Sequence, residues 1–302
     1  RIVEVRPFRV EDALDDGHVV IIAGFQGVSY RREVTTLGRG GSDTTAVAIA
    51  AALRAEACEI YTDVAGVYSA DPRVCLDAKH IAELSYDEML ELARAGAKVL
   101  AEECIVWARQ AGVALYVRAS DGRVGDSMVR FDEPKAPSRL VGVALRPDTR
   151  LWRFVDHGGV RAEVIAVLEA AGLPALVEVV VDTRDPAHQD AAACDFVELC
   201  VARDVADAVG AVFGRASARI DAIVVAAGGA PGVAGTLVSV VGSAVARDPA
   251  FGPRFDALVA GAMPRAVIGH GLLRSALVEA SEAAALAQVL HSVLFDGAEV
   301  AP

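Results

Sequence analysis

The chain has 302 residues, of which 54% are hydrophobic and 23% are charged. This composition describes a soluble globular protein with more than one core, and it excludes a disordered or collagen-like chain. The 29 Lys and Arg residues against 41 Asp and Glu residues give a net charge of -12. Because such a molecule repels a phosphate backbone, nucleic acid is not expected as a partner.

The cysteines and histidines do not predict a metal site. The five cysteines are odd in number and contain no Cys-x-x-Cys pair, which argues against a disulfide framework and a structural zinc site and favours the reducing cytoplasm. Four histidines are scattered without the spacing of metal ligands, and we assign no metal to them: His18, His80, His188 and His291.

Neither export nor a membrane span is predicted from the sequence. The first six residues lack the apolar segment of a signal peptide, and the chain is expected to begin within a domain. The uncharged run 222–246 is long enough to span a membrane, but Gly228, Gly229, Pro231 and Gly232 divide it. We predict two buried strands and a turn there, and no membrane partner.

The first predicted elements alternate between strands and helices. The apolar run 19–24 ends in glycine and predicts a buried parallel strand, followed by a glycine-rich turn. An alanine-rich helix is predicted over 43–55, with Ser42 or Asp43 capping its first turn. Residues 58–61 predict a second strand.

The alternation continues to about residue 118. Ser85 and Glu88 form a capping-box pattern that begins a helix reaching about residue 95, with Gly96 behind it. A helix over 102–111 and a strand over 113–118 follow. This order predicts an α/β fold: a mostly parallel sheet with helices on both faces.

A polar stretch with Pro and Gly at 119–139 predicts a linker, and we place a domain boundary near residue 135. The first domain is therefore expected over 1–134 and the second over 135–302. In the second domain the pattern βαββαβ is predicted twice, which indicates two ferredoxin-like units. Its expected elements are strand 140–145, helix 159–172, strands 176–182 and 195–201, helix 203–213, strands 219–226 and 236–242, helix 251–261, two short strands within 265–280, and helix 281–295.

The segment 35–46, TTLGRGGSDTTA, follows a predicted strand and opens a helix. Its glycines let backbone N–H groups approach an anion, and the helix N-terminus favours negative charge. The guanidinium of Arg39 is suited to a carboxylate, and Asp43 to an ammonium group or Mg²⁺. The alternative is an ordinary glycine-rich turn with a surface Arg and a capping Asp.

The segment 61–73, YTDVAGVYSADPR, also follows a strand. Ligands of open α/β sheets collect at the carboxyl ends of strands, where Thr62 and Asp63 are expected. Arg73 can balance phosphate charge. Lys98 is one of three lysines in the chain, and a surface position is its alternative interpretation.

Taken together, these segments resemble the C-terminal half of an aspartate kinase (aspartokinase) catalytic domain, within the amino acid kinase superfamily. The segments that carry the resemblance are GFQG at 24–27, TTLGRGGSDTTA at 35–46, YTDVAGVYSADPR at 61–73, ELSYDEMLELARAGAKVL at 83–100 and VALYVRAS at 113–120. The two βαββαβ units resemble the tandem ACT domains of these enzymes, in pattern more than in residues.

The resemblance implies a role for each matching position. Aspartate-binding positions of the family match Phe25, Arg39, Ser42 and Asp43, with Arg39 and Asp43 nearest the chemistry. Positions that hold ATP match Thr62, Asp63, Tyr68, Arg73 and Lys98. The implied reaction transfers the γ-phosphoryl of MgATP to the β-carboxylate of L-aspartate, in the biosynthesis of lysine, threonine and methionine. Such chemistry needs positioning and charge neutralisation.

The sequence also departs from the family pattern. The family's catalytic domain begins with a Lys-x-Gly-Gly loop, and no such loop stands before residue 24. The usual His-Pro after AKVL is Ala101-Glu102 here. The helix opening of the first ACT-like unit reads Asp156-His157-Gly158-Gly159, and the resemblance implies an effector site at Asp156, Gly158, Gly159 and Val160. Because a glycine pair replaces the usual Pro-Gly, ordering this turn costs more entropy, which predicts weak or absent feedback by lysine or threonine.

Three functional hypotheses remain. The first is an aspartate kinase that is cytoplasmic, uses ATP and Mg²⁺, and forms a homo-oligomer through its ACT-like units. The second is a non-catalytic nucleotide-binding or scaffolding partner that needs a second kinase chain for activity. The third is an amino acid kinase for another acid, which the GRGGSDTTA segment disfavours.

Overall fold

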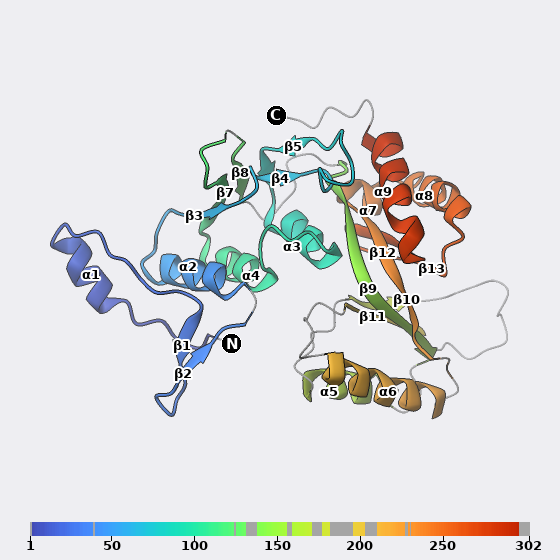
Figure 1. Ribbon diagram of the computed structural model, residues 1–302, viewed down its shortest axis with the longest axis horizontal. Coiled ribbons are helices and arrows are strands. Elements are labelled where there is room, and N and C mark those ends of the chain that lie inside the picture. The colour runs from blue at the N-terminus through green and yellow to red at the C-terminus, as the bar shows by residue number, and fades with distance from the viewer. Residues whose placement is uncertain are drawn as a thin grey trace.

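The computed structural model describes residues 2–38, 40–123, 125–130, 138–155, 159–170, 177–181, 196–202, 210–226, 229 and 231–295. Figure 1 shows two bodies of structure: the elements up to β8 form one, and a long twisted sheet with its helices forms the other.

The N-terminal segment is only loosely built into the fold. Helix α1 (Phe8–Asp15) has no buried residue, and within the described residues β1 (Gln26–Val28) pairs only with β2 (Val34–Thr36), in an antiparallel hairpin. The strand predicted over 19–24 is wrong: the segment forms no strand, and Val19 and Ile21 are 92% and 95% exposed. Its apolar pattern suits a buried strand, but no strand of the described residues lies beside it to accept its backbone hydrogen bonds.

A four-stranded mixed sheet forms the centre of the first body, in the order β3-β7-β8-β6. The pairs β3 with β7 and β6 with β8 are parallel, and β7 with β8 is antiparallel. The strands are β3 (Ala57–Thr62), β6 (Glu83–Leu84), β7 (Ala114–Ala119) and β8 (Ser127–Val129); β4 (Val67–Tyr68) and β5 (His80–Ile81) form a separate antiparallel pair. The strands predicted at 58–61 and 113–118 are confirmed. Strand β8 lies in the stretch that was predicted to be a linker. Its Ser127 and Val129 are buried, and the strand pairs within the sheet, so this part of the stretch belongs to the first body.

Helices α2 (Gly41–Ala52), α3 (Tyr86–Ala95) and α4 (Glu102–Ala111) pack with this sheet. The capping box at the start of α3 is confirmed: the Ser85 hydroxyl accepts the Glu88 N–H at 3.1 Å, and the Glu88 carboxylate accepts the Ser85 N–H at 3.0 Å. Gly96 ends α3 in the left-handed conformation, as predicted.

The second body is one antiparallel six-stranded sheet in the order β10-β11-β9-β12-β14-β13. The strands are β9 (Gly142–Val155), β10 (Val177–Val181), β11 (Phe196–Ala202), β12 (Val233–Val241), β13 (Ala266–His270) and β14 (Leu273–Val278). The helices are α5 (Val160–Ala170), α6 (Gly210–Ala226), α7 (Ser243–Arg247), α8 (Phe251–Val259), followed by the 3₁₀ turn η2 (Ala260–Ala262), and α9 (Ala280–Phe295).

Two ferredoxin-like units are present, as predicted, but they are interlocked rather than consecutive. The order β10-β11-β9-β12 makes one unit, which α5 and α6 cover. The order β9-β12-β14-β13 makes the other, which α8 and α9 cover. The long strands β9 and β12 belong to both units, so one continuous sheet connects the two sets of helices (Figure 1).

The strand predicted over 219–226 is wrong, because α6 occupies 210–226. The helix predicted over 203–213 overlaps the start of α6, and its first residues, 203–209, lie outside the described residues. Ala216, Ile220 and Val224 are all buried, and their spacing of four residues places them on one helical face against Trp152. An uninterrupted apolar run does not distinguish such a face from a buried strand. The second half of the uncharged run forms the buried strand β12, as predicted.

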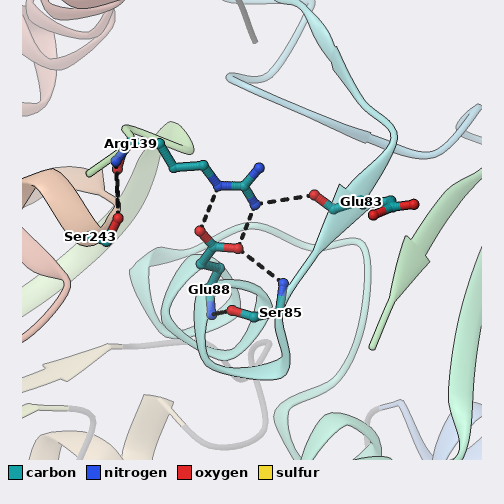
Figure 2. A network of polar contacts seen from close by, with 5 residues as sticks. All are labelled: Glu83, Ser85, Glu88, Arg139 and Ser243. Carbon is teal, nitrogen blue, oxygen red and sulfur yellow. Dashed lines mark hydrogen bonds and ion pairs between the residues drawn. The ribbon is translucent and has the colours of Figure 1, made fainter. Parts of the chain in front are cut away.

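The two bodies share a core and a buried ion pair. Leu92 of α3 and Leu237 of β12 belong to the same apolar cluster. Arg139 donates from Nε and Nη2 to the Glu88 carboxylate at 2.7 and 2.5 Å, and its backbone N–H donates to Ser243 at 3.0 Å (Figure 2). Arg139 therefore joins the start of α3 to the start of α7. The boundary predicted near residue 135 lies outside the described residues.

Within the part of the chain that the structure describes, no helix has the length and apolar character needed to cross a membrane.

Candidate active site

The start of α2 is the first place where candidate residues meet. Gly40 precedes the helix in the left-handed conformation, and a Cβ there would collide with Ala101, at the start of α4. A Cβ on Gly41 would lie 3.0 Å from the Phe25 ring. Phe25 itself donates its N–H to Thr45 Oγ1 at 3.1 Å. Glycines are therefore required here by close approach, as well as by backbone conformation.

The capping role predicted for Ser42 or Asp43 is wrong. Both lie inside the first turn of α2, and Gly40 stands at the cap position with no side-chain cap bond. The Ser42 hydroxyl instead donates to Asp43 Oδ1 at 3.3 Å. The Gly41 N–H donates to the Gly38 carbonyl at 3.1 Å, and among the described residues no side chain caps this turn. The positive end of the helix therefore favours an anion here.

Asp43 is the charged group at this helix terminus. Burial raises the pKa of its carboxyl, and the hydrogen bond from Ser42 offsets part of that rise. Its charge in turn raises the pKa of the Cys58 and Cys104 thiols, secondary to their burial. Arg39, the predicted carboxylate-binding residue, lies outside the described residues.

The predicted nucleotide residues Thr62 and Asp63 lie at the carboxyl end of β3, as the strand pattern predicts. The Thr62 carbonyl accepts the Ser120 N–H at 2.8 Å across the parallel pair with β7, and the Thr62 hydroxyl donates to Asp63 Oδ1 at 3.1 Å. Arg123 donates to the Asp63 carbonyl at 2.8 Å. Sequence reasoning missed Arg123 because it stands in the stretch interpreted as a linker.

Arg73 and Lys98 lie near this edge of the sheet. Arg73 binds Asp71 through Nε at 3.0 Å and Nη2 at 2.8 Å, while 89% of its side chain is exposed. Its hydrogen bonds lower the pKa of Asp71, and the exposed Lys98 adds to that effect from a distance. The charge of Asp63 also acts on Arg73. The structure thus brings Arg73 and Lys98 within electrostatic reach of Asp71, a carboxylate that the sequence analysis did not assign, and Asp63 within reach of Arg73.

Tyr68 is partly buried, and its ring meets His80 edge-on at 5.6 Å between centroids. His80 Nε2 lies 2.6 Å from the Gly125 carbonyl. This contact ties the loop before β8 to β5.

Of the four predicted effector residues, Asp156 and Gly158 lie outside the described residues. Gly159 has φ +88°, a conformation that favours glycine, and Val160 begins α5. Beside it, an open groove of about 420 Å³ runs between α5 and α6, lined by Val160, Glu163, Arg219, Ala222, Ile223 and Ala226.

Residues 1–119 match the amino acid kinase family. The chain is 43% identical over 196 residues to an aspartokinase of Thermus thermophilus, a match that covers 64% of this chain and 48% of the relative. It is 51% identical over 148 residues to an aspartokinase of Mycolicibacterium smegmatis, covering 48% of this chain and 35% of the relative. Among solved structures, E. coli aspartokinase III in complex with aspartate and ADP matches with a TM-score of 0.76 and 26% identity, covering 95% of this chain and 63% of that chain.

Strands β3, β6 and β7 of the sheet and the glycine-rich turns thus lie in the part of the chain, residues 1–119, that is similar to the amino acid kinase family. Within that family, the resemblance to aspartokinases predicted from the motifs is confirmed. The matched part spans less than half the length of these curated relatives.

Proposed function

We propose that this protein is an aspartate kinase, which transfers the γ-phosphoryl group of ATP to the β-carboxylate of L-aspartate. The observation that carries the proposal is the start of α2, where the glycine-rich turn at Gly40 and Gly41 brings the helix N-terminus beside the partly buried carboxylate of Asp43. The E. coli relative was solved with aspartate and ADP, the ligand and spent cosubstrate of such a reaction.

At the aspartate end, the ammonium group of the substrate pairs with Asp43. Burial raises the pKa of Asp43, and a cation beside the carboxylate reverses that penalty. Arg39 holds a substrate carboxylate in a bidentate pair, an assignment that rests on the resemblance. Phe25 and Ser42 complete the site, since the Phe25 ring lies beside Gly41 and the Ser42 hydroxyl donates to Asp43 in the same helix turn.

At the nucleotide end, Thr62 and Asp63 bind ATP at the carboxyl end of β3. Arg73 and Lys98 balance the charge of its phosphates. Tyr68 closes the site on the side of β5. Among the described residues no cluster of three His, Cys, Asp or Glu side chains could hold a metal ion. A site with one or two carboxylates fits Mg²⁺ that arrives with ATP phosphates, and Asp43 or Asp63 supplies such a carboxylate. Bound Mg²⁺ would neutralise charge on the transferring phosphoryl group.

In the proposed reaction an oxygen of the β-carboxylate attacks the γ-phosphorus, the bond to the β,γ-bridging oxygen breaks, and ADP leaves. The product is an acyl phosphate. No proton moves in this step, because a carboxylate is already a nucleophile, so positioning and charge neutralisation supply the rate.

The regulatory assignments are also proposals. We infer that the ferredoxin-like sheet senses an end product at 156–160 and pairs with a second copy of the chain. The reaction belongs to the biosynthesis of lysine, threonine and methionine in this proposal. The cytoplasm is the proposed location, which the free thiols of Cys58, Cys75 and Cys104 support.

The decisive experiment traps aspartyl phosphate with hydroxylamine after incubation of this chain with L-aspartate and MgATP. Formation of the hydroxamate at a rate well above that without aspartate supports the proposal. ATP binding without formation of the hydroxamate would instead support the second hypothesis, a nucleotide-binding partner that depends on another kinase chain. Another acceptor acid giving the faster reaction would support a different amino acid kinase.

Two variants test the assignment of the two ends. Arg39→Ala should weaken the binding of aspartate by about 2–4 kcal/mol, because a charge-assisted bidentate pair is lost, and it should leave the binding of ATP unchanged. Lys98→Ala should lower the affinity for ATP more than the affinity for aspartate. Calorimetric titration of each ligand measures both, with Arg109→Ala as the control at an exposed pair with Asp87. Equal loss of both ligands in either variant contradicts that assignment.

A further inference from the structure

The last helix, α9, contacts the predicted nucleotide segment through a buried histidine. His291 is 1% exposed, and its Nε2 lies 2.8 Å from the hydroxyl of Ser69, which is fully buried. Its Nδ1 lies 3.2 Å from Asp77 Oδ1 without forming a hydrogen bond. The ring stacks on Phe295 at 5.0 Å and 7°. Ser69 and Asp77 bracket the Asp-Pro-Arg turn that presents Arg73.

Ser69 is itself fixed in place by the segment it begins. Its hydroxyl accepts the Lys79 N–H at 2.8 Å, and its backbone N–H donates to the Lys79 carbonyl at 2.8 Å. The hydroxyl proton is therefore free to be donated to Nε2 of His291, which leaves the ring proton on Nδ1, facing Asp77. The Ser69 hydroxyl and Nε2 are then paired, while Nδ1 faces the Asp77 carboxylate at 3.2 Å without a hydrogen bond.

In space, Ser69, His291 and Asp77 are arranged as in a hydrolytic triad, with the histidine between the hydroxyl and the carboxylate. The site cannot act as a triad. Ser69 and His291 are closed to solvent, so no substrate reaches the hydroxyl. The role of the contact must be to hold structure in place.

Other contacts tie the same segment to α9. Lys79 Nζ donates to the Phe295 carbonyl at 2.8 Å, and Gln288 donates to the Val74 carbonyl at 2.9 Å. Ala70 and Cys75 are buried in the apolar cluster that contains Leu290 and Phe255. The segment 69–79, which lies between β4 and β5 (Figure 1), is thus packed on the second body. Its turn residue Arg73 remains exposed.

We propose that His291 is a positioning residue for the nucleotide site: it anchors segment 69–79 to α9, so that ATP affinity depends on a side chain of the six-stranded-sheet body. The inference rests on the proposed nucleotide role of Arg73. It adds a route by which a shift of α9 changes that site without any contact between α9 and the nucleotide.

The test compares three variants in this chain by two measurements. Hydrogen exchange of the amides at 69–79 reports the anchor and needs no ligand, and titration with ATP and with aspartate reports the site. For His291→Ala we expect faster exchange at 69–79, unchanged exchange in β3, and about tenfold weaker ATP binding with aspartate affinity unchanged. His291→Gln keeps a polar group near the Nε2 position and should restore most of the ATP affinity. Val289→Ala, at a 45% exposed position of the same helix, should change neither.

A further control separates loss of the anchor from general destabilisation. Phe255→Leu, in α8, removes volume from the same core and should lower stability without weakening ATP. Unchanged exchange at 69–79 in His291→Ala overturns the anchor. Faster exchange with unchanged ATP affinity, or equal weakening of ATP in Phe255→Leu at matched stability, overturns the positioning role. Absence of ATP binding in the unmodified chain overturns the proposed function and the positioning role with it, while the exchange result still decides the anchor.

Discussion

Glu88 is a carboxylate in the interior of the protein, with no exposed side-chain surface. It accepts two hydrogen bonds from Arg139 and one from the Ser85 N–H, which together compensate for its lost hydration (Figure 2). The capping box was readable from the sequence. The partner across the core was not, because 51 residues separate Arg139 from Glu88.

Arg139→Ala should therefore be strongly destabilising. It leaves a buried carboxylate without a counter-charge, and such losses amount to about 3–5 kcal/mol. Arg109→Ala breaks a pair with the neighbouring Asp87, but that pair is exposed and should contribute no more than about 1 kcal/mol. Urea denaturation of the two variants measures the difference. Equal midpoints would show that Glu88 does not depend on Arg139.

A second prediction at the residue scale concerns alkaline pH. Burial, with smaller effects of Asp43 and Cys58, raises the pKa of Cys104 from 9.0 to about 12. Because the folded state holds the neutral thiol, its contribution to stability is complete below pH 9 and is lost as the pH rises toward 12. In the native chain Cys104 should thus resist alkylation at pH 9, whereas it should react in urea. Mass spectrometry of its peptide decides; rapid alkylation of the native chain would contradict the burial.

At the scale of elements, α3 is fixed at both ends by arginines, one just before β9 and one within it. Besides the Arg139 contact at its start, the Arg94 carbonyl at its end accepts a hydrogen bond from Arg146. Gly96 follows with φ +115°, and a Cβ there would collide with the Leu145 carbonyl. Lys98 comes two residues later. The contacts with β9 therefore fix the backbone from which the Lys98 side chain extends toward the nucleotide residues.

Gly96→Ala tests the close approach. The strained conformation and the collision together should lower stability by about 2–5 kcal/mol. Gly112 ends α4 in the same left-handed region, with nothing within 4 Å of an added Cβ, so Gly112→Ala should lose only about 1–2 kcal/mol. Thermal unfolding of both variants separates the effect of conformation from that of contact. A smaller loss for Gly96→Ala than for Gly112→Ala would contradict the packing of α3 on β9.

Helix α6 shows where element assignment from sequence fails. Its apolar residues run continuously from Ile223 to Ala226, and a buried strand has the same composition. Only the packing of α6 beside α5 and over Trp152 selects the helix. Helix α4, in contrast, was predicted with its observed bounds, because polar residues alternate with its apolar residues at helical spacing.

At the scale of the whole molecule, apolar side chains are distributed unequally. Ile21 is 95% exposed, whereas Ile60 in β3 is 7% exposed. Ile21→Ala should change the unfolding free energy by less than about 0.5 kcal/mol. Ile60→Ala should cost about 2–5 kcal/mol, because it opens a cavity. Chemical denaturation checks both, and a large loss for Ile21→Ala would mean that this segment is covered in solution.

The amino-acid sequence by itself determined the local features. Capping residues, glycines at helix ends and short polar-bounded strands depend on neighbours within a few positions, so the capping box of Ser85, α4 and the place of Thr62 and Asp63 were predictable. The family resemblance likewise rests on contiguous motifs such as that at 35–46.

The tertiary structure decided everything that depends on contacts between distant segments. The strand predicted at 19–24 fails because pairing partners, and not composition alone, make a strand. The sharing of β9 and β12 by two units, the Arg139–Glu88 pair and the contact of His291 with Ser69 join residues from about 50 to 222 positions apart. Hydrogen-bond geometry and core volume select those contacts, and no local sequence pattern encodes either quantity.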